Sequence, residues 1–268
     1  MKKCHILACM LLPASLYGAA ISAPGITEPI IDATLSSSVP GMIKTLHVKE
    51  GERVKKGQVI LTLDQALETL EVARRKLAWE SKVEVEAAEA RAALLLQDYE
   101  GTKKLFETTQ SISKEDLDKK DLEYRLSVAE WQRLEIVEQR EALEYQIAEQ
   151  QLLRKLVKAP GDGIITTILL EEGENCQERQ PLARFVDISQ GHFISNIDAS
   201  LVGKIKTGQA VTVSVPIGTK MITLPATLSY IAPVVDPASG LLEIKALFMN
   251  PQENIRPGVA GTLNLEVE

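Results

Sequence analysis

The sequence contains few aromatic residues, few cysteines and no net positive charge. Aromatic residues make up 4% of the 268 residues, and the formal net charge is −7 at pH 7. Proteins that bind nucleic acids neutralise phosphates with clustered Lys and Arg, and those that bind single strands also stack bases on aromatic side chains. Because the sequence offers neither feature, we expect no nucleic-acid partner.

Long apolar runs are also scarce. The run "ILACMLLPASLYG" near the N-terminus is too short to cross a bilayer of ~30 Å as a helix. It follows the basic start "MKK", and small residues suited to signal-peptidase cleavage stand at Gly18, Ala19 and Ala20. We therefore predict a signal peptide over residues 1–20 and a periplasmic protein associated with the cell envelope, with an uncleaved membrane anchor as the alternative.

Cleavage would leave a single cysteine, Cys176, in the mature chain. One cysteine can form neither an intramolecular disulfide nor a redox-active pair. Histidine is equally sparse, since His5 lies in the predicted signal peptide and His47 and His192 have no neighbours at metal-ligand spacing. We therefore expect no enzyme activity, no metal and no cofactor.

Proline is absent from Gln58 to Ala159, and this segment is rich in strong helix formers. The cluster "TTQSIS" at residues 108–113 interrupts it, and Ser113 with Asp116 has the spacing of a helix N-cap and its reciprocal partner. We predict two helices of about 45 residues that form an antiparallel coiled-coil hairpin over residues 65–157. At about 1.5 Å per residue, each arm would extend on the order of 65 Å.

Apolar residues at helical spacing predict which faces of the two helices meet. The first helix carries Ala66, Leu70, Ala73 and Leu77, then, after a slip near Ser81, Val85, Ala88, Ala92, Leu95, Tyr99 and Phe106. The second carries one stripe of Leu122, Leu126, Ala129, Ile136, Leu143 and Ile147 and an adjacent stripe of Tyr124, Val128, Trp131, Ala142, Tyr145, Leu152 and Leu156. Both stripes are candidates for the seam, and the charged residues of so thin a rod are expected to be solvated.

Two similar segments flank the predicted rod. "EGERVKKGQ" at residues 50–58 returns 122 positions later as "EGENCQERQ" at residues 172–180. Alternating apolar residues and glycine turns predict short strands around both. Val54 of the first segment corresponds to Cys176 of the second, so we expect Cys176 to be a small buried hydrophobe rather than a nucleophile.

The shared pattern, G-x-I followed by EG and GQ, resembles the two halves of a biotinyl/lipoyl domain. Each half would expose apolar strands that the other covers, so the resemblance implies one sandwich although the rod separates its halves. Carrier domains of this type bear an acylated Lys in the turn between the halves. Here Asp64, Gln65 and the rod occupy that place, and Lys55 and Lys56 lie in a different turn, so no covalent cofactor is expected.

A lipoyl-like domain split by a helical hairpin is similar to the haemolysin-D-like membrane fusion proteins, the periplasmic adaptor subunits of tripartite efflux and secretion systems. The strings "KTGQAVTVSV", "VVDPASG" and "NIRPGVAG" resemble the β-barrel of that family. The implied fold class is mixed α and β, with a split lipoyl-like β-sandwich, an inserted coiled-coil hairpin and a small β-barrel. The predicted domains are an N-terminal strand at 21–36 that joins the barrel, the sandwich at 37–64 and 158–187, the hairpin at 65–157 and the barrel at 188–268.

The resemblance implies an inner-membrane transporter of RND or ABC type, an outer-membrane TolC-like channel and several copies of the chain in a ring. The chain ends directly after the predicted barrel, so we expect the barrel to contact the transporter. Adaptors that dock on TolC-like channels carry an Arg, a Leu and a Ser at the hairpin tip. Thr102, Phe106 and Ser113 occupy these places, and Lys103 and Lys104 supply the nearest positive charge. These five residues are the candidate docking site.

Two other functions are compatible with these patterns. A biotinyl/lipoyl-type carrier or binding protein would show an acylated Lys by intact-mass measurement. A free-standing structural coiled-coil protein would show no transport defect on deletion.

Overall fold

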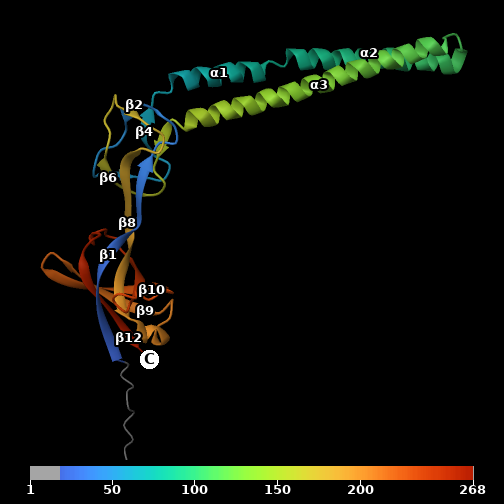
Figure 1. The fold of residues 1–268 in the computed structure, drawn as a ribbon. Coiled ribbons are helices and arrows are strands. Elements are labelled where there is room, and N and C mark those ends of the chain that lie inside the picture. Colours follow the sequence, from blue (N-terminus) through green and yellow to red (C-terminus); the bar gives the residue numbers. More distant parts are fainter. Residues whose placement is uncertain (1–18, 268) are drawn as a thin grey trace, which may run out of the picture.

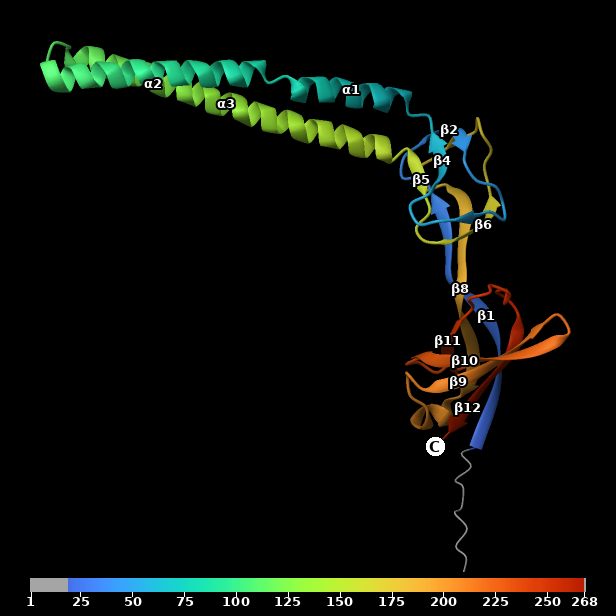
Figure 2. The same ribbon diagram turned by 180° about the vertical axis from the view of Figure 1, so that it is seen from behind.

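The computed structural model describes residues 19–267 of the chain. A long helical rod projects sideways from a small β-sandwich, and a β-barrel lies below the sandwich in both views (Figure 1 and, from behind, Figure 2). The N-terminal end of the first strand lies at the end of the barrel that faces away from the sandwich. This architecture confirms the predicted fold class.

The rod consists of three helices: α1 (Ala66–Glu80), α2 (Val83–Thr109) and α3 (Lys114–Leu153). The prediction of one continuous first arm was wrong, because the chain leaves the helix at Ser81, whose ψ of 94° is extended. The break changes which positions of the helical repeat face α3. On α1 the inward face ends with Trp79, and it resumes on α2 with Val85.

The apolar stripe of α2 faces α3 as predicted, and Ala92 is buried there. On α3 the stripe that includes Tyr124, Trp131 and Tyr145 lies at the seam. The other stripe was a wrong candidate, since its leucines and isoleucines are exposed. The predicted α1 residues Leu70 and Leu77 are exposed as well.

The tip of the rod has well-defined helix ends. Gln110 closes α2 in the left-handed region, with φ of 52°. Ser113 caps α3 by accepting the Asp116 N–H at 3.1 Å, which confirms the predicted N-cap. Asp116 does not return a hydrogen bond to the Ser113 backbone as a capping box would. Its carboxylate instead accepts a hydrogen bond from the Ser113 hydroxyl at 2.6 Å.

The sandwich interleaves its two halves. The first half supplies β2 (Gly41–Leu46), β3 (Arg53–Val54) and β4 (Val59–Leu63), and the second supplies β5 (Leu156–Lys158), β6 (Gly163–Ile168) and β7 (Asn175–Cys176). β2 pairs with β7 and β3 pairs with β6, so each half completes the other. Ile43 and Ile165, equivalent in the repeat, are 1% and 0% exposed. Cys176 is buried in this core, as expected of a small hydrophobe.

The turns of the two halves repeat the same hydrogen bonds. The Gly51 N–H donates to the Ile165 carbonyl at 2.7 Å, and the Gly173 N–H donates to the Ile43 carbonyl at 2.8 Å. Both glycines have positive φ, 83° and 89°, a conformation that other L-residues rarely adopt. The repeated "EG" is therefore explained by a turn through which each half forms a hydrogen bond to the other.

The barrel is formed by β1 (Ala19–Ser36), β8 (Pro181–Asp198), β9 (Ala210–Ile217), β10 (Lys220–Ile231), β11 (Leu241–Met249) and β12 (Ala260–Val267), with a 3-10 helix, η1 (Ala199–Lys204), after β8. The strand order β1-β12-β9-β10-β11-β8 closes because β1 also pairs with β8. Alternate residues of β9, such as Val211, Val213 and Val215, point into its core. β1 and β8 continue beyond the barrel into the sandwich, where β6 joins β8.

The signal peptide predicted over residues 1–20 lies outside the described residues, apart from Ala19 and Ala20. These two residues begin β1 and pair with Val267 and Glu266 of β12.

Candidate functional site

The candidate docking residues lie around the free end of the rod, where α2 turns into α3. Lys103 and Lys104 are exposed on the last turns of α2. Thr102 is half-buried, and its hydroxyl donates to the Asp98 carbonyl at 2.8 Å. Phe106 is half-buried on the inward face of α2, and Ser113 serves as the N-cap of α3. Only the two lysines thus present their functional groups freely to a partner.

Leu105 is a tip residue that the motif comparison missed. Its side chain is 49% exposed beside the two lysines. Phe106 lies on the seam, so the neighbouring residue of α2 points outward. The tip therefore combines one exposed apolar side chain with two exposed positive charges, a combination suited to a protein surface that has an apolar patch and acidic groups.

The two outer edges of the rod carry rows of exposed apolar side chains. The edge formed by α1 and α2 presents Leu67, Leu70, Leu77, Val83, Leu94 and Leu105, with exposed fractions from 49% to 79%. The edge formed by α3 presents Leu122, Leu126, Ile136, Leu143 and Ile147, with exposed fractions from 57% to 66%. Rows of exposed apolar side chains along one face are compatible with protein contacts. The α3 stripe that runs from Leu122 to Ile147, which the sequence made a candidate for the seam, belongs to this outer surface.

The base of the rod is held by aromatic and ionic contacts instead of leucines. Trp79 of α1 stacks on Tyr145 of α3 with ring centroids 5.3 Å apart. Arg75 pairs with Glu144 across the seam, and Lys155 pairs with Glu68 at 3.0 Å. Because these polar and aromatic residues occupy the inward face of α1, its leucines are left on the outside.

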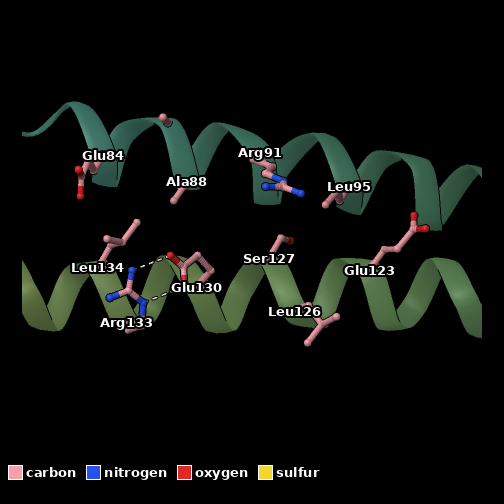
Figure 3. Close-up of a pocket in the computed structure, with 11 residues that line it drawn as sticks. Glu84, Ala88, Arg91, Leu95, Glu123, Leu126, Ser127, Glu130, Arg133 and Leu134 are labelled. Carbon is pink, nitrogen blue, oxygen red and sulfur yellow. Dashed lines mark hydrogen bonds and ion pairs between the residues drawn. The ribbon is translucent and has the colours of Figure 1, made fainter.

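A groove of about 680 Å³ lies between α2 and α3 in the middle of the rod (Figure 3). Ala88 of α2 and Ser127 of α3 both line it, and Ser127 lies opposite Arg91 and Leu95. Its rim mixes charges of both signs, including Glu130, which accepts two hydrogen bonds from Arg133 at 2.8 and 2.7 Å. An open groove with this lining suits the side chains of a neighbouring protein better than an enclosed small molecule.

Ion pairs shift the pKa values of several rod residues. Hydrogen bonds from Arg74 and Arg75 lower the pKa of Glu71 to about 2. The hydrogen bond from Arg133 lowers the pKa of Glu130 in the same way. In the barrel, partial burial lowers the pKa of His192, with help from the charge of Lys245. None of these groups adjoins a nucleophile or a metal-ligand set, so the shifts describe ion pairing and burial.

The place of a carrier lysine is occupied by the entrance to the rod. β4 ends at Leu63, and Asp64 and Gln65 lead directly into α1. Within residues 19–267, no three His, Cys, Asp or Glu side chains gather as a metal site. None of the helices in that range is long and apolar enough to span a membrane.

Two family models match the chain. The barrel-sandwich hybrid domain of RND membrane fusion proteins matches residues 32–188, which is more than half of the chain. The chain belongs to the membrane fusion proteins. A CusB-like β-barrel domain matches residues 195–268. Membrane fusion proteins are adaptors of efflux systems rather than enzymes, and the family is periplasmic and associated with the cell envelope.

Individual proteins are similar to this membrane fusion protein in sequence or in fold. An uncharacterized protein of Haemophilus influenzae is 24% identical over 228 residues, which are 85% of this chain and 52% of that protein. This chain thus spans about half the length of that relative. MacA from Actinobacillus actinomycetemcomitans has a TM-score of 0.76 at 22% identity, covering 94% of this chain and 79% of that one. ZneB from Cupriavidus metallidurans has a TM-score of 0.51 at 18% identity, covering 94% and 71%.

Proposed function

We propose that this membrane fusion protein is the adaptor of a tripartite efflux or secretion system. It links an inner-membrane transporter of the RND or ABC type to an outer-membrane TolC-like channel, and several copies pack side by side in a ring. The resemblance of the whole chain to adaptors supports the two membrane partners. The observation that carries the ring is the presence of exposed apolar rows on both outer edges of the rod.

A ring requires each copy to present two different complementary faces, one to each neighbour. The α1/α2 edge and the α3 edge are two such faces, and a single copy leaves both in water. A single two-helix rod cannot enclose a conduit, whereas several rods packed edge to edge form the wall of a tube. Leu77 and Leu143, one on each edge, are 72% and 59% exposed and would be covered in this arrangement.

The two ends of the molecule suit two different partners. The rod tip presents Leu105, Lys103 and Lys104, and we assign it to the outer-membrane channel. The barrel loop between β10 and β11 presents Val234, whose side chain is 73% exposed. Leu241, at the end of this loop, pairs with Asp198 at the end of β8 that points away from the sandwich. We assign this end of the barrel to the inner-membrane transporter.

Photo-cross-linking in living cells tests these assignments. A benzophenone amino acid replaces Leu105 in one strain and Val234 in another, and cross-linked proteins are identified by mass spectrometry. We expect the first position to capture an outer-membrane channel and the second an inner-membrane transporter. Capture of the same protein at both positions, or of neither class at either position, would refute the proposal. Thr166, an exposed residue of β6 in the sandwich, serves as the control position that should capture neither.

A further inference from the structure

The sandwich and the barrel are joined through a narrow crossing. β1 and β8 pass side by side from one domain to the other (Figures 1 and 2). β8 pairs with β6 of the sandwich up to Val186, and it pairs with β11 of the barrel starting at Gln190. Between these two residues the sheet is reduced to the β1–β8 ribbon. Two strands alone form a weak structure that twists and bends more readily than a full sheet.

The ribbon is also irregular at the crossing. The pairs Pro29–Gly191 and Ile31–Asp187 flank a shift in register, so β8 has more residues than β1 between them. A bulge of this kind bends the strand and increases its local twist. The crossing therefore has the properties of a hinge.

Beside the crossing, one ion pair connects the two domains directly. Arg53 belongs to β3 of the sandwich, and Glu253 belongs to the barrel loop between β11 and β12. The Arg53 Nη1 donates to the Glu253 Oε1 at 2.7 Å, and the Nη2 contacts the Oε2. The guanidinium thus faces both carboxylate oxygens, which is the strongest geometry for such a pair.

Glu253 is held firmly on the barrel side. Its N–H donates to the Asn250 carbonyl at 2.9 Å. Asn250 is 3% exposed, and its side-chain amide donates to the carbonyls of Ile188 and Ile255, both at 2.9 Å. The loop that carries Glu253 is therefore fastened to the bulge itself. Movement of the sandwich would separate Arg53 from a carboxylate that stays with the barrel.

The Arg53–Glu253 pair lies beside two cavities. Cavities of about 340 and 630 Å³ lie between the domains, and Arg53 and Glu253 line both. The Arg53 side chain is 67% exposed. Because no packed core surrounds the pair, breaking it leaves the two domain cores intact.

We propose that Arg53 and Glu253 form a clasp that sets the angle between the sandwich and the barrel. With the clasp closed, the narrow crossing has a third point of attachment. When it opens, the sandwich and the rod swing as a unit about the bulge in β1 and β8. An ion pair whose arginine is largely exposed to water biases such an equilibrium by a modest factor, so the clasp favours one angle without locking it.

Distances between spin labels measure the angle in the full chain. Cys4 and Cys9 are replaced by Ser, and Cys176 by Val, the residue at the equivalent position of the repeat. Labels are then attached at Lys44→Cys in the sandwich and Thr212→Cys in the barrel, two exposed strand positions. The distance distribution is recorded by double electron–electron resonance for this background, for Arg53→Glu, and for the charge swap Arg53→Glu/Glu253→Arg.

Arg133→Glu is the matched control. It breaks an Arg–carboxylate pair within α3 whose side chains are 60% and 50% exposed, against 67% and 20% for Arg53 and Glu253, and it changes the net charge equally. We expect Arg53→Glu to raise the population outside the main distance peak several-fold, the charge swap to restore the peak, and Arg133→Glu to leave it unchanged. An unchanged distribution in Arg53→Glu, no restoration by the swap, or equal broadening in Arg133→Glu would overturn the proposal. Export is not measured, so the result is independent of the partners proposed above.

Discussion

Glu50 and Glu172 occupy the same place in the two halves of the repeat, and each accepts a backbone hydrogen bond from the opposite half. The Glu50 Oε1 accepts the Ile168 N–H at 2.7 Å, and the Glu172 Oε1 accepts the Leu46 N–H at 2.7 Å. The two carboxylates thus connect residues that lie 118 and 126 positions apart in the chain, on either side of the rod.

Removing either carboxylate should weaken the sandwich by a similar amount. We expect Glu50→Ala and Glu172→Ala each to lower the free energy of unfolding by about 1 kcal/mol, because each removes one charge-assisted hydrogen bond at an exposed site. Chemical denaturation measures the change. Glu171→Ala, an exposed neighbour, is the control that should have little effect. Unequal losses in the two variants would argue against their symmetric role.

The sandwich should fold without the rod. The Leu63 N–H donates to the Lys155 carbonyl at 2.9 Å, so the two ends of the inserted segment already lie together. We expect a chain in which a short Gly/Ser linker replaces residues 65–154 to remain soluble and to unfold cooperatively on heating, since a shorter connection lowers the entropy cost of closure. The linker must spare Val157, which is buried and pairs with Leu61.

The same shortened chain offers a check on the core. Ile43→Asp or Ile165→Asp should unfold it, because an unpaired carboxylate in a small apolar core costs several kcal/mol. Aggregation of the parent shortened chain, or tolerance of these substitutions, would contradict the mutual dependence of the two halves.

Charges on the outer edges should separate assembly from folding. We expect Ile136→Glu/Leu143→Glu to abolish self-association, because the two new charges would lie in the proposed contact between copies. The monomer should still fold, because these side chains are 66% and 59% exposed and do not pack in its core. The thermal transition should move little, as surface substitutions usually change stability by less than about 0.5 kcal/mol each. Sedimentation velocity measures the assembly. Gln146→Glu, on the same helix, should leave it unchanged, and persistence of the wild-type assembly in the double variant would exclude this edge.

At the tip, Leu105 and Phe106 should respond differently. We expect Leu105→Asp to abolish export while stability stays unchanged, because the side chain faces solvent. Phe106→Asp should lower both, because it places a charge on the seam. Lys103→Glu/Lys104→Glu should reduce export through lost charge complementarity. Export, periplasmic level and thermal stability are measured together. If both Leu105→Asp and the double Lys variant export normally, the channel does not dock on the tip.

The rod should contain one unusually acidic carboxyl group. Arg74 and Arg75 lower the pKa of Glu71 from 4.5 to about 2. Since the folded-state pKa lies below that of the unfolded chain, the ion pairs stabilise the rod above pH 4.5, and their contribution is lost as the pH falls toward 2. Carboxyl carbon NMR should show the Glu71 titration near pH 2, and Arg74→Ala/Arg75→Ala should return it toward 4.5. A midpoint near 4.5 in the wild type would show that solvent screens the pairs.

Local features of the fold were predictable because they depend on neighbours in the chain. The absence of proline and the Ser113 cap determine where a helical hairpin begins its second arm. The repeated "EG" at Gly51 and Gly173 identifies two equivalent turns, since each needs a positive φ that glycine adopts without strain. The spacing of apolar residues was enough to select the correct inward face of α2.

The seam of α3 and the face of α1 could not be predicted in the same way. A helical period shows that a face is apolar, but both stripes of α3 satisfy it, and only the neighbour decides which stripe is buried. On α1 the stack of Trp79 on Tyr145 and the pair of Arg75 with Glu144 outweigh the leucines, and the break at Ser81 changes the phase.

Local patterns in the sequence were thus enough to predict a helical hairpin inserted between two similar β segments, and their resemblance to known families added the split sandwich and the following barrel. Three features became visible only in the folded chain: which apolar rows are exposed to water, how β1 and β8 are shared by two domains, and the pairing of Arg53 with Glu253. These depend on contacts between segments as much as 200 residues apart, and such contacts are set by how the finished domains pack, which no local pattern records.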